Sequence, residues 1–109
     1  MKNLFENIPA DLPEELFETL VKTEEIEIER IVSRGHRSPG EGWYDQGSTE
    51  FVLLTKGGAR LEYEDGRLIS LGPGDWIEIP AGVRHRVVWT DEEKETVWLA
   101  VHYRKLRDV

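Results

Sequence analysis

The sequence predicts an all-β domain in which short antiparallel strands form a sandwich or a small barrel. Two observations favour this fold class. Apolar and polar residues alternate along short segments, as they do in strands that bury one face. Turn residues such as Gly57-Gly58, Asp65-Gly66 and Gly72-Pro73-Gly74 separate these segments. Turn signals spaced by about 8–12 residues are typical of sandwiches and barrels and not of parallel α/β sheets.

The first element expected along the chain is a short amphipathic helix that ends near Lys22. Residues 11–14 combine an Asp cap, a proline in the first turn and a Glu three residues after the cap. The apolar residues that follow recur at helical spacing: Leu12, Leu16, Phe17, Leu20 and Val21. We therefore expect a helical segment within residues 1–24.

Seven strands are expected after this segment. The stretch I-E-I-E-R-I-V-S alternates and predicts a strand at residues 26–33. The remaining six are expected at residues 51–56, 59–64, 67–71, 75–79, 85–89 and 95–103. With 109 residues and no linker or repeat, the chain is expected to form one domain over residues 1–109, with a β-barrel over residues 25–105.

Composition excludes several classes of function. The chain contains no cysteine, which rules out disulfides, thiolate metal sites and cysteine nucleophiles. A formal net charge of −8 argues against a nucleic-acid partner, because binding to a phosphate backbone needs a basic face. No signal peptide or membrane-spanning stretch is apparent, so we expect a cytoplasmic protein without a membrane partner.

Polar side chains from two distant segments are expected to converge. Tyr44, Gln46 and Glu50 share one strand face if the strand bends regularly through residues 47–49. The later segment G-D-W-I-E-I-P-A-G-V-R-H predicts a strand, a Pro-x-Gly turn and a new strand that opens with His85. Two facing hairpins of this kind would place a carboxylate, an amide oxygen and an imidazole around one point.

These residues resemble the two sequence motifs of the cupins. Glu50 with Gly57 seven residues later is similar to the end of the first motif, H-x-H-x3-4-E-x6-G. The stretch from Gly74 to His85 resembles the second motif, G-x5-P-x-G-x2-H-x3-N. The resemblance implies a double-stranded β-helix, or jelly-roll barrel. The chain departs from the pattern at Tyr44 and Gln46, where the family usually has histidines, and at Trp89 in place of Asn.

The charge of Glu50 must be balanced if its side chain points inward, because an ionised carboxylate inside a barrel costs several kcal/mol. A divalent metal held by Gln46, Glu50 and His85 would balance it. The alternatives are a metal-free Glu50 held by an arginine or by Tyr44, or a protonated carboxyl group. His36, eight residues before Tyr44, or His102, on the face of Trp98, could supply a second imidazole, or each could be structural. A set of two His and one carboxylate suits Fe(II), Mn, Ni or Zn.

Three hypotheses about function follow. The first is a metal-dependent enzyme acting on a small polar molecule, with Tyr44 and Glu50 as catalytic candidates; the resemblance permits dioxygenase, isomerase, lyase or cyclase chemistry. The second is a metal-free small-molecule-binding or sensor module. The third is a protein–protein partner that docks through its helix and tryptophans. The resemblance also implies a homodimer, to which the strand at residues 26–33 could contribute by adding to a neighbour's sheet.

Overall fold

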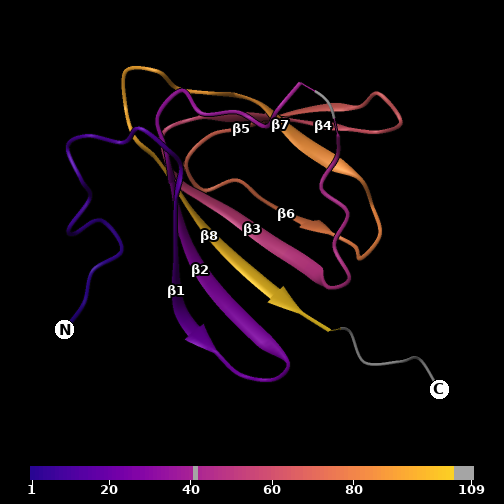
Figure 1. Cartoon of the computed structure of the whole chain (residues 1–109), viewed down its shortest axis with the longest axis horizontal. Coiled ribbons are helices and arrows are strands. Elements are labelled where there is room, and N and C mark those ends of the chain that lie inside the picture. The colour runs from indigo at the N-terminus through magenta and orange to yellow at the C-terminus, as the bar shows by residue number, and fades with distance from the viewer. Residues whose placement is uncertain (41, 105–109) are drawn as a thin grey trace.

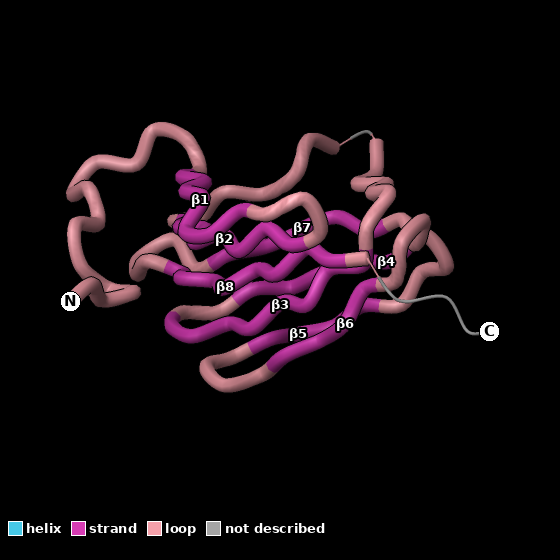
Figure 2. Tube along the Cα trace, turned by 90° about the horizontal axis from the view of Figure 1, so that it is seen from below, coloured by secondary structure: helices cyan, strands magenta, loops and turns pink. Residues whose placement is uncertain are grey.

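The computed structural model describes residues 1–40 and 42–104, which form eight β-strands in two antiparallel sheets (Figures 1 and 2). The larger sheet has the strand order β1-β2-β8-β3-β6, and the smaller sheet has the order β5-β4-β7. The strands are β1 (Leu16–Lys22), β2 (Ile26–Ser33), β3 (Thr49–Lys56), β4 (Ala59–Tyr63), β5 (Leu68–Leu71), β6 (Trp76–Ile79), β7 (His85–Thr90) and β8 (Thr96–Tyr103). The predicted all-β jelly roll is confirmed.

One hydrophobic core joins the two sheets. The larger sheet contributes Val52 and Leu54 from β3 and Trp98 from β8, while the smaller sheet contributes Leu61 and Leu71. Val52 and Leu54 are separated by two residues and so point to the same face of β3, as the alternation in the sequence requires. The seven strands expected from such alternation and from the turn residues agree with β2 to β8 to within two residues at each end.

The predicted N-terminal helix is wrong. Residues 11–15 form no regular element, and the apolar residues that suggested a helix fall mainly in β1, which pairs antiparallel with β2 from Leu16 opposite Val32 to Lys22 opposite Glu27. A helix of about ten residues is marginal on its own, whereas the edge of β2 offers a ladder of hydrogen bonds. Pairing with β2 therefore overrides the helical spacing of the apolar residues. Separately, no helix in the described part of the chain has the length and hydropathy needed to cross a membrane.

Arg30 holds the N-terminal segment against β2. Its side chain is almost fully buried, and its Nη1 donates to the carbonyl oxygens of Leu4 at 3.0 Å and Glu6 at 2.6 Å. Its Nε donates to the carboxylate of Glu18 at 3.0 Å. The charge of a buried guanidinium is thus compensated, and the chain before β1 is tied to the outside of the larger sheet.

The first motif ends at a glycine that no other residue can replace without cost. Gly57 has φ of +89°, in the left-handed region, and an added Cβ would lie 2.6 Å from Cα of Thr96 and 2.7 Å from the carbonyl oxygen of Glu95. Glycine is required there because the turn from β3 to β4 passes directly against β8. This close approach fixes the end of β3, and hence the position of Glu50 earlier in the same strand.

The barrel boundary expected at residue 105 lies outside the described residues. The lower boundary, residue 25, is corrected to residue 16, because β1 belongs to the larger sheet.

Candidate functional site

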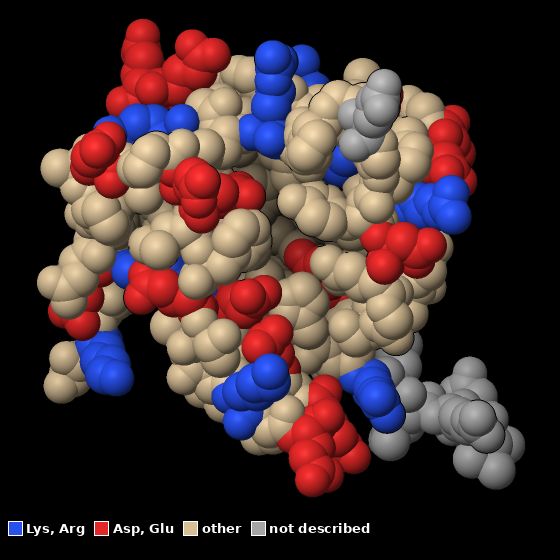
Figure 3. All heavy atoms as spheres, in the orientation of Figure 1, with Lys and Arg blue, Asp and Glu red and all other residues tan. Residues whose placement is uncertain are grey.

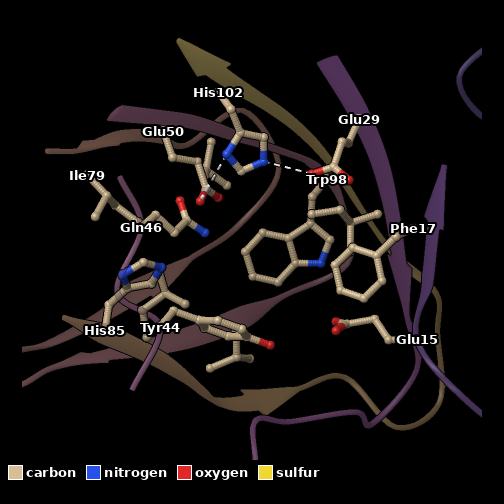
Figure 4. A pocket seen from close by; sticks show the side chains of 14 residues that line it. Glu15, Phe17, Glu29, Tyr44, Gln46, Glu50, Ile79, His85, Trp98 and His102 are labelled. Carbon is tan, nitrogen blue, oxygen red and sulfur yellow. Dashed lines mark hydrogen bonds and ion pairs between the residues drawn. The ribbon is translucent and has the colours of Figure 1, made fainter. Parts of the chain in front are cut away.

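A cavity of about 100 Å³ lies between the two sheets, and the candidate residues gather around it (Figure 4). The face in Figure 3 is hollowed near its centre, with acidic atoms inside the hollow. Four of the sequence-predicted residues come from the two motifs, and these are Tyr44, Gln46, Glu50 and His85. His102 on β8 also lines the cavity. The structure therefore brings together five of the six candidates.

Backbone pairing explains how the two motifs meet. The N–H of Tyr44 donates to the carbonyl oxygen of His85 at 2.8 Å, and the N–H of His85 donates back to Tyr44 at 3.2 Å. The two aromatic rings then lie 5.7 Å apart between centroids. The Pro-x-Gly turn is held in the same way, since the N–H of Gly82 donates to the carbonyl oxygen of Gln46 at 2.9 Å. The segment before β3 is thus paired with the start of β7, and the two together form one wall of the cavity.

His85 offers one ring nitrogen to the cavity. It is 5% exposed, and its Nδ1 lies 3.1 Å from the carbonyl oxygen of Val83. A carbonyl oxygen only accepts, so Nδ1 carries the proton and Nε2 keeps its lone pair in the neutral ring. Histidines that bind metals commonly donate their other N–H to a backbone carbonyl in this way.

Glu50 is buried with little in the described chain to balance its charge. The residue is 7% exposed, and its one ion-pair contact among the described residues is His102, whose Nδ1 lies 3.8 Å from Oε2. The other nitrogen of His102, Nε2, donates to Glu29 at 2.7 Å. In the neutral ring Nδ1 of His102 therefore carries no hydrogen, so it and Oε2 of Glu50 are two acceptors that face each other. A cation or a proton between these two atoms would satisfy both.

Gln46 leaves an unpaired acceptor in the same place. Its Oε1 is buried and has no hydrogen-bond partner among the described residues. In Figure 4 the amide of Gln46 points into the cavity beside the carboxylate of Glu50. An unpaired buried oxygen is costly and calls for a partner such as a metal ion or a ligand donor. The donor set of Gln46, Glu50 and His85 therefore fits a divalent cation.

A tighter cluster of metal-ligand atoms lies at the edge of this cavity. Within residues 1–40 and 42–104, the only three His, Cys, Asp or Glu residues whose ligand atoms all lie within 4.8 Å of one another are Glu27, Glu29 and His102. Glu50, His85 and His102 surround the cavity but are more widely spaced. A metal ion held by the motif residues would need an oxygen such as Gln46 Oε1 as a further ligand.

His36 does not join the site, which corrects the expectation that it could supply the second imidazole. It follows β2 after a turn at Gly35, whose N–H donates to the carbonyl oxygen of Asp91 at 2.7 Å. The carbonyl of His36 then accepts from Thr90 at 2.6 Å, and its Nδ1 accepts from the N–H of Arg34 at 2.9 Å. These bonds hold His36 along the end of β7, outside the residues that line the cavity.

Among the other cavity residues, four with an acidic or aromatic side chain were not identified from the sequence as site residues. Glu15 lies immediately before β1 and Phe17 lies at its start, where a helix was expected, so their face could not be assigned. Glu29 lies two residues before Ile31 in the alternating stretch and shares its inward face. Trp98 lies four residues before His102 and shares its strand face, and this spacing was the available signal that Trp98 would reach the same cavity.

A model of the cupin domain matches residues 31–102, which include both motifs and all six candidate residues. The chain belongs to the cupin family. A crystal structure from Ralstonia eutropha JMP134, described as a "putative mannose-6-phosphate isomerase", is 42% identical with a TM-score of 0.92, and the match covers 96% of this chain and 98% of that chain. None of the curated proteins matches this cupin.

More distant structures share the fold alone. A cupin superfamily protein from Desulfitobacterium hafniense DCB-2 is 17% identical with a TM-score of 0.73, over 90% of this chain and 84% of that chain. An RmlC-like cupin with a double-stranded β-helix fold from Methanocaldococcus jannaschii is 23% identical with a TM-score of 0.70, over 89% of this chain and 86% of that chain. Both agree with the two-sheet barrel described above.

Proposed function

We propose that this cupin binds a divalent metal ion and a small polar molecule in its barrel and acts as a metal-dependent enzyme. The observation that carries the proposal is the unpaired Oε1 of Gln46 beside the buried carboxylate of Glu50. His85 lines the same cavity, and its Nε2 has no hydrogen-bond partner among residues 1–40 and 42–104. An oxygen and nitrogen donor set of this kind suits Fe(II), Mn, Ni or Zn.

Gln46, Glu50 and His85 would hold the ion, and His102 is placed to join them. When bound, a divalent ion supplies Lewis-acid polarisation of a carbonyl or hydroxyl oxygen of the substrate. The chain itself supplies groups that hold or move protons. One is His102, which donates Nε2–H to Glu29, and this bond orients the imidazole ring. The other is the hydroxyl group of Tyr44, a residue that is 41% exposed.

Similarity to the protein from Ralstonia eutropha favours isomerase chemistry among the four classes that cupins suggest. Isomerisation of an aldose moves a proton between adjacent carbons and therefore needs a base and an acid close to one another. Glu50 and Tyr44 are the candidates for this pair in our proposal. A sugar fits this cavity better than a sugar phosphate, because none of the described residues that line it is a Lys or Arg that could bind a phosphate.

Metal analysis of protein purified without chelator tests the first half of the proposal. We expect a stoichiometric ion, and a rise in melting temperature when Mn, Fe(II), Ni or Zn is added to chelator-treated protein. Glu50→Gln and His85→Ala should each lower the bound metal at least about tenfold, as loss of one ligand does. His36→Ala is the matched control, because His36 lies outside the cavity, and it should leave metal content unchanged.

Protein that holds no ion and does not respond to any of the four metals would exclude the metal-dependent enzyme. An equal loss of metal in His36→Ala and His85→Ala would also contradict the assignment of ligands, since it would indicate a general effect on folding.

A metal-free binding module is the second candidate, and the His102–Glu50 contact favours it. A protonated His102 would donate to both Glu29 and Glu50 and offset one of their two negative charges without an ion. In that case Glu50→Gln should keep the fold and the binding of small molecules, as isothermal titration calorimetry can show. A docking role for exposed tryptophans, the third hypothesis, would be contradicted by an isolated oligomer with an accessible cavity.

A further inference from the structure

The lining of the cavity is acidic, and this bears on the kind of molecule that can enter. Glu15, Glu29 and Glu50 all contribute to it, and no Lys or Arg does so over residues 1–40 and 42–104. Ser33 donates to the carboxylate of Glu15 from a fully buried hydroxyl. Figure 4 shows Glu15 on the side of the cavity opposite Gln46 and His85. The acidic groups therefore surround the cavity and are not confined to the proposed metal site.

The arginines nearest to the cavity wall along the chain already have carboxylate partners. Arg84, next to His85, binds Glu64 at 3.1 Å and Asp45 at 3.3 Å, and these two carboxylates raise the pKa of Arg84. Arg86 donates to Glu62 at 2.7 Å. Neither is available to neutralise an anion in the cavity without losing these bonds.

Trp98 presents an unpaired donor to the same space. The residue is 4% exposed and lines the cavity, and its Nε1 is buried with no hydrogen-bond partner among the described residues. In Figure 4 the indole nitrogen lies on the side of Phe17 and Glu15. Buried indole N–H groups usually have an acceptor, so a ligand oxygen would remove this cost.

The geometry points to a small hydroxylated ligand that carries no negative charge, of which an amino alcohol fits best. This inference rests on the proposed function, because it names the class of molecule for the same cavity. A ligand ammonium group would donate to Glu15 or to Glu29, and a hydroxyl group would accept from Trp98 Nε1. A hydroxyl hydrogen can also donate to Oε1 of Gln46. A phosphate or carboxylate offers acceptors alone and meets the like charges of Glu15 and Glu29, which the proposed metal ligands do not include.

Three probes that share one carbon skeleton test this inference: 2-amino-1,3-propanediol, glycerol and glycerol 3-phosphate, with mannose 6-phosphate as a fourth. Binding is followed by nuclear magnetic resonance on the indole N–H of Trp98, whose signal is assigned by its loss in Trp98→Phe. We expect the aminodiol to bind more tightly than glycerol, and at least about tenfold more tightly than either phosphate, in both chelator-treated and zinc-loaded protein.

Glu15→Gln should reduce the preference for the aminodiol over glycerol by roughly threefold or more, since one attractive charge is lost. Glu14→Gln is the matched control, because Glu14 is the adjacent acidic residue and is exposed outside the cavity lining, and it should leave the preference unchanged.

Binding of either phosphate as tightly as the aminodiol, in either form of the protein, overturns the inference and leaves the proposed metal enzyme standing. A Trp98 signal that no probe shifts also overturns it. The metal half of the proposed function is judged separately, by metal content and melting temperature.

Discussion

Replacing Gly57 by alanine should destabilise the barrel far more than replacing Gly66, although both residues have nearly the same backbone conformation. Their φ angles are +89° and +94°. Alanine in this region costs about 1–2 kcal/mol at either position. At Gly66 an added Cβ meets no atom within 4 Å, whereas at Gly57 it lies 2.6 Å from Cα of Thr96. Overpacking of this kind adds about 1–3 kcal/mol.

Thr96 cannot move aside freely, because it is fully buried and its hydroxyl is bonded to the backbone of Gly58 at 3.1 and 3.2 Å. We therefore expect a loss of about 2–5 kcal/mol for Gly57→Ala, a large part of the 5–15 kcal/mol that is typical of a domain.

Urea unfolding followed by tryptophan fluorescence measures both variants against the wild type. Equal destabilisation by Gly57→Ala and Gly66→Ala, within about 0.5 kcal/mol, would refute the argument that close approach of the two strands requires this glycine.

Three further predictions concern the rest of the chain. Arg30→Met should cost roughly 2–3 kcal/mol, because charge-assisted bonds to the N-terminal segment are lost, and should speed hydrogen exchange of residues 4–7; unchanged exchange would contradict it. Asp91 accepts hydrogen bonds from the N–H groups of Glu93 and Lys94, and these bonds lower the pKa of its carboxyl group. The contribution of Asp91 to stability is therefore complete above the usual pKa of 3.8 and is lost as pH falls through the lowered pKa. Asp91→Asn should therefore flatten the acid side of the stability profile, and a profile identical to that of the wild type would refute this. We also expect a homodimer, because β1 is an edge strand and leaves Phe17 54% and Val21 48% exposed. Light scattering after size-exclusion chromatography should give twice the monomer mass of 12.6 kDa, and a monomer at all concentrations would exclude it.

Most of the barrel could be predicted from local patterns because its strands bury one face and alternate accordingly. Val52, Leu54 and Leu61 show this alternation directly, and turn residues separate the strands. The first segment could not be predicted in this way, since Leu16, Leu20 and Val21 satisfy a helical spacing as well as a strand. An open edge on β2 decides between them, and that edge exists only in the folded sheet.

The fold class and the two segments whose side chains meet follow from the chain alone, because motif glycines, a proline and period-two alternation are local features. The histidine that lies beside Glu50 is set instead by contacts between distant strands. His36 and His102 are equally plausible along the chain, but pairing of β8 with β3 places His102 opposite Glu50, while the turn at Gly35 directs His36 away. Pairing between distant strands also sets the acidic lining of the cavity, since Glu29 reaches it from β2 and Glu15 from the residue before β1. Register between distant strands has no local signature, and this is the physical reason that the composition of the site emerges only from the folded sheets.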